Sequence, residues 1–377
     1  MRVVFLVRSL NFGGVERQLV LLAKGMDKTR FEPVVLCFYG GGPLENELVQ
    51  AGIRVIALEK HSRWDVPGFL WRLVRKVGEL KPDVLHGYLP VPNFLAALLK
   101  LIYPSMRVVM GVRTSGKDLT RYDWTFRFSF WLERLFSGLA DLVILNSQAG
   151  KAAYAKKGFR LDKMTVISNG IDTNVYRPDP GPGGALRVEW HVPDAAALVG
   201  MVGRLDPMKG HPVFLQAAAG LRDAPVYFAV IGDGPQAYRQ RLVGLASSLG
   251  LDACLVWAAS RQDVTSLYNA LDICCSASIF GEGFPNVVGE AMACGIPCVV
   301  TDVGDSAWVV GTAGIVVPPD DCKALSEAIS RLACLSREDR SALGEQARKR
   351  VVENFSTEVM VRSTQDALAA LVGNRRT

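Results

Sequence analysis

A regular alternation of short apolar segments with stretches of helical periodicity is the feature that most constrains how this chain can fold. The apolar segments of the first half have the length of buried strands and lie at residues 3–7, 33–37, 54–58, 84–86, 107–112 and 142–146. The stretch between the first two, at about residues 15–26, has the apolar spacing of a helix. Short apolar strands that alternate with helices are typical of a parallel sheet covered on both faces.

A segment rich in Pro and Gly interrupts this alternation once. Residues 179–184 read Asp-Pro-Gly-Pro-Gly-Gly, which we interpret as a linker. Beyond it the alternation resumes, with strands predicted at residues 198–202, 226–231, 254–257, 273–276, 297–301 and 314–317. A chain of 377 residues is long enough for two domains. We therefore predict two doubly wound α/β domains, at residues 1–180 and 190–355, and a last helix within residues 356–377.

The composition excludes several other classes of protein. Hydrophobic residues make up 49% and charged residues 21%, which is enough apolar material for folded cores and excludes a disordered chain. No apolar stretch reaches the ~20 residues of a membrane span, and the first residues read as a strand rather than a secretory signal. The 8 cysteines form no Cys-x-x-Cys pair and the 4 histidines are scattered. We expect reduced thiols, no metal site and a cytoplasmic protein.

The charge is distributed unevenly along the chain. Residues 1–180 contain 26 basic and 16 acidic residues, a net charge of +10, whereas residues 181–377 contain 17 and 21, a net charge of −4. A basic first half suggests an acidic partner, either nucleic acid, an anionic membrane surface or a phosphorylated substrate, and does not choose among them.

Residues 121–136 combine Trp and Phe with arginines, Arg127 among them. Two interpretations stay open for this segment. It is either a helix that lies in a membrane interface or an ordinary helix that packs its aromatic side chains into the core.

Ligands of doubly wound domains bind at the carboxyl ends of the strands, and a cleft between two such domains is a natural site. After the first strand, Gly13 and Gly14 allow close approach of a ligand to the backbone in front of a helix, although a plain tight turn explains them equally well. His86 and Arg113 end two further strands, where either a structural or a binding role is open.

The second domain carries cations at the corresponding place. Arg204 and Lys209 follow a predicted strand within Gly-Arg-Leu-Asp-Pro-Met-Lys-Gly, and a planar guanidinium beside a point-like ammonium suits a diphosphate. Gly232 begins the loop after the next strand. Two solvated surface cations are the competing interpretation.

The most informative segment spans residues 280–297. Pro285 fits the first position of a helix that ends before Gly295, and the free amides at residues 286–288 would form a phosphate site. Glu282 precedes this helix and Glu290 lies a turn and a half inside it, so they are too far apart for an acid/base pair and would hold hydroxyl groups at two places on one ligand. The predicted binding segment is Glu282, Gly283, Phe284, Pro285, Asn286, Val287 and Glu290.

The ordered set of these motifs resembles the retaining glycosyltransferases of family 4. The similarity rests on Glu-x7-Glu at Glu282 and Glu290, on the Arg204 and Lys209 loop, on Ile-Gly-Asp-Gly-Pro at 231–235 and on Gly-Gly-Val-Glu-Arg at 13–17. Residues 167–172 also resemble the segment that closes the first domain of the family.

This resemblance implies a GT-B fold, that is, two Rossmann-like doubly wound domains facing a central cleft. It implies a UDP- or GDP-linked sugar donor, with Arg204, Lys209 and the amides at residues 286–288 at the diphosphate, Glu282 at the sugar and Glu290 at the ribose. The segment 259–261, which includes Arg261, would touch the base. The donor sugar would be transferred with retention, and neither a cofactor nor a metal is expected.

Two departures from the family pattern stand out. Arg113 occupies the place where many members carry a histidine, and Ala259 stands where a glycine is frequent. The resemblance implies cell-surface polysaccharide or lipopolysaccharide synthesis. The basic first half and the segment 121–136 favour a glycan or lipid-linked acceptor at the cytoplasmic face of an anionic membrane, with peripheral contact to it.

Other functions compete with this one. A GT-B nucleotide-sugar epimerase would need acid/base histidines, and a catalytically silent sugar-binding or partner subunit would need none of these residues intact. A nucleic-acid-binding protein would explain the charge, but no recognition module is present and no nucleic acid is expected. The sugar, the base and the acceptor are not determined by the sequence.

Overall fold

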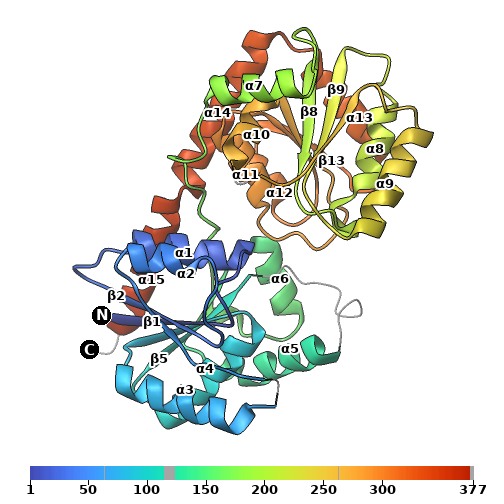
Figure 1. Cartoon of the computed structure of the whole chain (residues 1–377). Coiled ribbons are helices and arrows are strands. Elements are labelled where there is room, and N and C mark those ends of the chain that lie inside the picture. Colours follow the sequence, from blue (N-terminus) through green and yellow to red (C-terminus); the bar gives the residue numbers. More distant parts are fainter. Residues whose placement is uncertain (63, 114–123, 262, 374–377) are drawn as a thin grey trace. The chain divides into compact units, whose positions relative to one another are not determined.

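The computed structural model describes residues 1–373 except residues 63, 114–123 and 262 (Figure 1). These residues form two compact units. Unit 1 runs from Met1 to Gly170 and includes the end of the chain from Thr357, and unit 2 runs from Ile171 to Ser356.

The described part of unit 1 contains a seven-stranded parallel sheet in the order β3-β2-β1-β4-β5-β6-β7. The strands are β1 (Arg2–Val7), β2 (Glu32–Cys37), β3 (Arg54–Ala57), β4 (Val84–Tyr88), β5 (Arg107–Val112), β6 (Leu142–Leu145) and β7 (Met164–Val166). The chain starts at the centre, moves to one edge and then crosses to the other side, so that β1 and β4 lie side by side where the order reverses. This point is the usual ligand position in such folds.

Helices cover both faces of this sheet (Figure 1). The helices α1 (Gly14–Gly25), α2 (Glu45–Gln50) and α15 (Thr357–Gly373) pack on one face, which receives Val3 and Phe5 of β1. The helices α3 (Val66–Leu80), α4 (Pro90–Ile102), α5 (Trp124–Phe136) and α6 (Gln148–Lys156) pack on the other, which receives Val4 and Leu6. Alternate residues of one strand thus enter two cores, which is why the strand is apolar throughout.

Unit 2 repeats this architecture with six parallel strands among its described residues, in the order β10-β9-β8-β11-β12-β13. The strands are β8 (Ala197–Val202), β9 (Val226–Ile231), β10 (Leu255–Ala258), β11 (Ile273–Ser276), β12 (Cys298–Thr301) and β13 (Gly314–Val317). One face carries α7 (Pro180–Glu189), α10 (Val264–Ala270), α11 (Asn286–Ala293), α12 (Ser306–Val310) and α14 (Arg337–Phe355). The other carries α8 (His211–Ala219), α9 (Gln236–Ser248) and α13 (Cys322–Ala333). The two doubly wound α/β domains predicted from the sequence are therefore present.

The segment interpreted as a linker has a different role. Pro180 begins α7, where the missing amide hydrogen of proline costs nothing, and the units divide earlier, between Gly170 and Ile171. Gly183 is buried against α10, and a Cβ atom at this position would lie 2.3 Å from the carbonyl oxygen of Asn269. The glycine serves close helix packing, and the linker interpretation was wrong because composition alone does not distinguish this from flexibility.

Among the described residues, no helix is long and apolar enough to cross a membrane.

The helix α11, which carries much of the predicted site, is held against α14 by a close backbone contact. A Cβ atom at Gly344 of α14 would lie 1.9 Å from the carbonyl oxygen of Gly295, the residue that follows α11. We expect Gly344→Ala to lower the free energy of unfolding by roughly 1–3 kcal/mol, because the two helices must separate.

Gly244 of α9 provides the matched control, because no atom lies within 4 Å of a Cβ placed there. Gly244→Ala should raise the free energy of unfolding by roughly 0.5–1 kcal/mol through helix propensity alone. Denaturant titration of both variants checks the pair, and equal effects would contradict the packing argument.

Candidate functional site

The carboxyl edge of the unit 2 sheet contains a pocket of about 310 Å³. It is lined by Val202, Gly203, Arg204, Ile231, Gly232, Asp233, Ser260, Arg261, Val264 and Leu267. Three residues predicted from the sequence, Arg204, Gly232 and Arg261, therefore line one pocket, although they come from three different loops.

Two glycines open this edge. Gly203 and Gly232 both have positive φ values, 145° and 147°, and a Cβ atom at Gly232 would lie 2.0 Å from the carbonyl oxygen of Gly203. A larger residue at Gly232 cannot fit, since the two loops touch through their backbones. The loops that follow β8 and β9 thus touch each other, and both glycines line the pocket.

The two predicted cations differ in their surroundings. Arg204 is 69% exposed and its Nη2 lies 2.7 Å from a carboxylate oxygen of Asp206. The other oxygen of Asp206 accepts the amide hydrogen of Met208 at 3.0 Å, which fixes the short 3₁₀ turn Pro207–Lys209. This turn is joined to the end of β11, because the amide of Ile279 donates to the carbonyl of Met208 at 2.9 Å.

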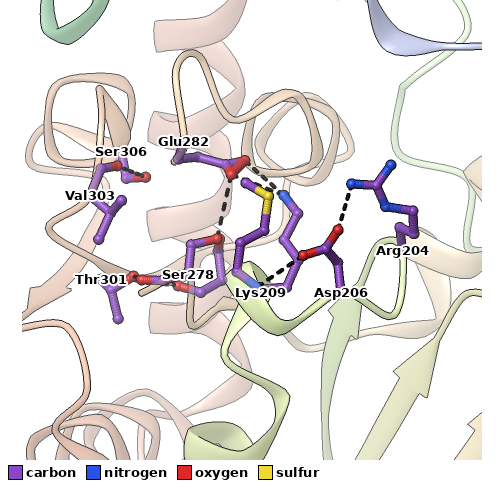
Figure 2. A network of polar contacts seen from close by, with 10 residues as sticks. Arg204, Asp206, Lys209, Ser278, Glu282, Thr301, Val303 and Ser306 are labelled. Atoms are coloured by element: carbon purple, nitrogen blue, oxygen red, sulfur yellow. Dashed lines mark hydrogen bonds and ion pairs between the residues drawn. The ribbon is translucent and has the colours of Figure 1, made fainter. Parts of the chain in front are cut away.

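Lys209 and Glu282 form an ion pair with each other (Figure 2). The Nζ of Lys209 donates to Oε1 and Oε2 of Glu282 at 2.7 and 3.0 Å. The side chains are 18% and 8% exposed, respectively. The sequence placed both residues in the site but gave no sign that they contact each other.

The loop that carries Glu282 is supported from behind. The amide of Asp305 donates to the carbonyl of Gly283 at 2.9 Å, and the hydroxyl of Thr301 donates to the carbonyl of Ser278 at 2.5 Å. Figure 2 shows Ser278 and Thr301 of this support, together with Glu282. The carboxylate is therefore presented by a loop with backbone contacts to two neighbouring segments.

The helix α11 begins one residue later than expected. Pro285 precedes it as the cap and Asn286 is its first residue. The amide of Val288 donates to the carbonyl of Pro285 at 3.1 Å, so Val288 is not one of the free amides that the sequence suggested. Pro285 has no side chain that could accept this amide hydrogen, and its backbone carbonyl accepts it instead.

Glu290 is positioned by a residue that the sequence analysis missed. The hydroxyl of Tyr268, from α10, donates to Oε2 of Glu290 at 2.6 Å. Burial, and then the nearby Glu290 carboxylate, raises the pKa of Tyr268 well above its usual value, so the hydroxyl keeps its proton. A tyrosine on an apolar helix face reads as an ordinary core residue, and only the packing of α10 on α11 shows its partner.

At the carboxyl edge of the unit 1 sheet, Gly13 caps α1 and Gly14 is its first residue. The carboxylate of Glu16 folds back over this loop, since its Oε2 lies 2.2 Å from the position of a Cβ on Gly13. Burial raises the pKa of Glu16. Glu16 belongs to the motif Gly-Gly-Val-Glu-Arg, but the sequence gives no sign that its carboxylate lies over the loop.

Arg113 and His86, which both belong to strand ends in the sequence, have different surroundings in the structure. The Nη1 and Nη2 of Arg113 donate to Asn169 at 3.0 Å and to the hydroxyl of Tyr88 at 3.2 Å. His86 is completely buried between the rings of Phe5 and Tyr88. The sequence left a structural or a binding role open for His86. Its burial beside Phe5, which lies opposite it on the neighbouring strand, favours the structural role. Thr114 and Ser115, which follow Arg113, lie outside the described residues.

The helix α5 exposes a stripe of large apolar side chains. Trp124, Phe128, Trp131 and Leu135 are 72%, 52%, 52% and 58% exposed. Their spacing of four, three and four residues places them on one face, and the rings of Phe128 and Trp131 stack at 5.9 Å. The core interpretation holds for Phe130, which is buried, but not for this stripe. The first residues of the predicted segment, 121–123, lie outside the described residues.

Comparison with known proteins identifies the family. A model described as glycosyltransferase family 4 matches residues 12–175, and a model described as glycosyl transferases group 1 matches residues 196–334. The chain is a GT4-type glycosyltransferase. Its two parallel sheets with alternating helices are the GT-B fold of solved structures such as HepE of Anabaena.

Individual relatives give further detail. EpsF of Bacillus subtilis, described as a glycosyltransferase, is 24% identical to this glycosyltransferase over 80% of the chain and 79% of EpsF. The D-inositol 3-phosphate glycosyltransferase of Mycobacterium tuberculosis is 31% identical over 61% of the chain, and the match spans 48% of that relative's length. The structure of HepE with UDP has a TM-score of 0.85 at 25% identity and covers 98% of this chain and 100% of HepE.

The buried His86 generates a prediction on pH dependence. Desolvation, and then the charge of Arg113, lowers the pKa of His86 from 6.5 to about 3. Below pH 6.5 the His86 side chain binds a proton in the unfolded chain, whereas in the folded protein it stays neutral down to about pH 3. The free energy of unfolding therefore falls as the pH drops through this window. We expect His86→Phe to remove this loss, which amounts to about 2 kcal/mol at pH 5.

The measurement is the free energy of unfolding at pH 5 and pH 8. The exposed His61 provides the control, because His61→Phe should keep the pH dependence of the wild type. An effect of His86→Phe that is equal at both pH values would show that His86 is not neutral in the fold.

Proposed function

We propose that this glycosyltransferase transfers a sugar from a UDP- or GDP-linked donor to a glycan or lipid-linked acceptor, with retention at the anomeric carbon, in cell-surface polysaccharide or lipopolysaccharide synthesis. The observation that carries the proposal is the pocket lined by Gly203, Gly232 and Arg204, with Lys209 of the Lys209–Glu282 pair close to Gly203. Structures of HepE were solved with UDP and with UDP-glucose, and HepE is 25% identical to this chain.

The charges of the pocket suit a diphosphate. Arg204 is exposed and paired with Asp206 at the surface, so its guanidinium is available to a phosphate, and Lys209 adds a second cation. The N-terminus of α11, beginning at Asn286, favours an anion through its dipole. These groups would offset the charge that develops on the leaving diphosphate, so the proposed reaction needs neither metal nor cofactor.

The two glutamates have separate proposed roles. Glu282 would hold hydroxyl groups of the donor sugar, and Glu290, oriented by Tyr268, would hold the ribose. The base would lie beside Arg261, whose guanidinium is 3.4 Å from Glu189. No side chain of the described site is placed as an evident nucleophile, and a front-face route assisted by the leaving phosphate accounts for retention.

The acceptor would bind at the strand ends of unit 1. Gly13 and Gly14 offer backbone there, and Arg113, held by Tyr88 and Asn169, offers a fixed guanidinium for a phosphate or sugar. We propose that Arg113 takes the role of the histidine that many family members carry. An epimerase is less well supported, because His86 and His211 are both buried with pKa values lowered to about 3 and about 4.

A lipid-linked acceptor would explain the exposed stripe on α5. The exposed charged residues of this helix are Arg127 and Arg134, and its single acidic residue, Glu133, is buried. Trp and Phe beside arginines suit the interface of an anionic membrane. We propose that the protein acts on the cytoplasmic side with α5 at the membrane surface.

The donor proposal predicts that a nucleoside diphosphate stabilises the folded protein. Titration with UDP, GDP and their sugar conjugates should raise the thermal midpoint for one base, because a ligand that binds only the folded state raises it. Arg204→Ala and Lys209→Ala should each lose most of the shift. Arg222→Ala, which removes an exposed cation paired with Asp223 outside the pocket, should keep it. The absence of a shift with every nucleotide would contradict the proposal.

The membrane proposal predicts binding to vesicles of phosphatidylglycerol and phosphatidylcholine at low salt. Arg127→Glu should weaken binding about tenfold or more, because each basic residue at an anionic surface contributes ~1 kcal/mol and the reversal counts twice. Arg239→Glu, the same charge change on α9 of unit 2, serves as the control. Co-sedimentation measures both, and equal losses would indicate an effect of net charge alone.

A further inference from the structure

The Lys209–Glu282 pair presents a conflict between the two residues that the proposed function uses for different parts of the donor. Lys209 is assigned to the diphosphate and Glu282 to the sugar. In the structure, however, the ammonium donates to both carboxylate oxygens, at 2.7 and 3.0 Å. A diphosphate can accept all the hydrogen bonds of the Lys209 ammonium only if the hydrogen bonds from Lys209 to Glu282 break.

This competition is stronger than that at Arg204. The Lys209 and Glu282 side chains are 18% and 8% exposed, so solvent screens their attraction little. Arg204 is 69% exposed, and its partner Asp206 is also engaged with the amide of Met208. The exposed pair is weak by comparison, so an arriving phosphate meets its main competition at Lys209.

A carboxylate at this place also repels a phosphate. When the carboxylate accepts hydrogen bonds from sugar hydroxyls, it is occupied elsewhere and Lys209 is left to the diphosphate. When no sugar is bound, the carboxylate of Glu282 pairs with Lys209 instead, as it does in this structure.

We propose that Glu282 competes with the nucleoside diphosphate for Lys209 and thereby makes the site favour the intact donor over the nucleoside diphosphate that remains after transfer. This inference rests on the proposed function. The sugar of the donor draws Glu282 away from Lys209, and loss of the sugar lets Glu282 return and weaken the hold on the leaving diphosphate. Glu282 is then a residue for product release as well as for sugar binding.

The decisive test is the affinity of Glu282→Gln for UDP, GDP and inorganic pyrophosphate, measured by calorimetry. A residue that only binds sugar would leave these affinities unchanged. We expect the variant to bind the nucleoside diphosphate of the preferred base, and pyrophosphate, about fivefold or more tightly than the wild type, while transfer is lost. Glu282→Ala should show the same direction, and the thermal midpoint of each unliganded variant confirms that it is folded.

Two controls make the test specific. Asp302→Asn removes an exposed carboxylate of the same unit, on the loop that also holds Asp305, without touching Lys209, and should change the affinities less than twofold. In a Lys209→Ala background, Glu282→Gln should give a clearly smaller gain, because the competition needs the ammonium and only the repulsion between carboxylate and phosphate remains.

The outcomes separate the inference from the proposed function. Unchanged or weaker binding by Glu282→Gln, an equal gain in Asp302→Asn, or an equally large gain without Lys209 would each overturn the inference. Failure of the wild type to bind UDP, GDP and pyrophosphate would overturn the proposed function itself, and the inference with it.

Discussion

Burial of both faces of a parallel sheet is the constraint on which the rest of each unit depends. Once helices occupy the two faces, the loops after the strands are the part of the sheet left open to a ligand. In unit 2, β8 and β9 end side by side in Gly203 and Gly232, whose loops touch through their backbones. The pocket and the exposed Arg204 lie at that junction.

The second general feature of unit 2 is that charged groups near the pocket are held in pairs. Arg204 contacts Asp206, Lys209 contacts Glu282, and Tyr268 donates to Glu290. A buried charge without a partner is costly, which accounts for the pairing of Lys209 with Glu282, whereas Arg204 is exposed and its pairing with Asp206 is weak. Ligand binding then replaces these protein partners by groups of the ligand. The difference in affinity between two ligands depends on which of the pairs each ligand breaks.

Unit 1 distributes its polar groups differently. Its buried polar residues include His86, which is neutral in the core, and Asn93, which donates to Glu133 and bonds both backbone groups of Gly111. Burial raises the pKa of Glu133 to about 7. The surface of α5 instead gathers Trp, Phe and Arg, and these exposed groups, rather than the buried ones, are suited to a partner.

The sequence by itself determined the two doubly wound domains, because a strand buried on both faces must be apolar throughout and such strands alternate with helices in both halves of the chain. It also determined which loops carry Arg204, Gly232 and Glu282, since these residues adjoin the strands and helices along the chain. Only the tertiary structure decided that Lys209 contacts Glu282, that Tyr268 orients Glu290 and that His86 lies in a core. These contacts join segments brought together by the order of strands in the sheet, and local periodicity carries no information about that order. For the same reason, the Pro and Gly of residues 179–184 read as a linker, whereas the packing of α7 on α10 makes them part of a helix.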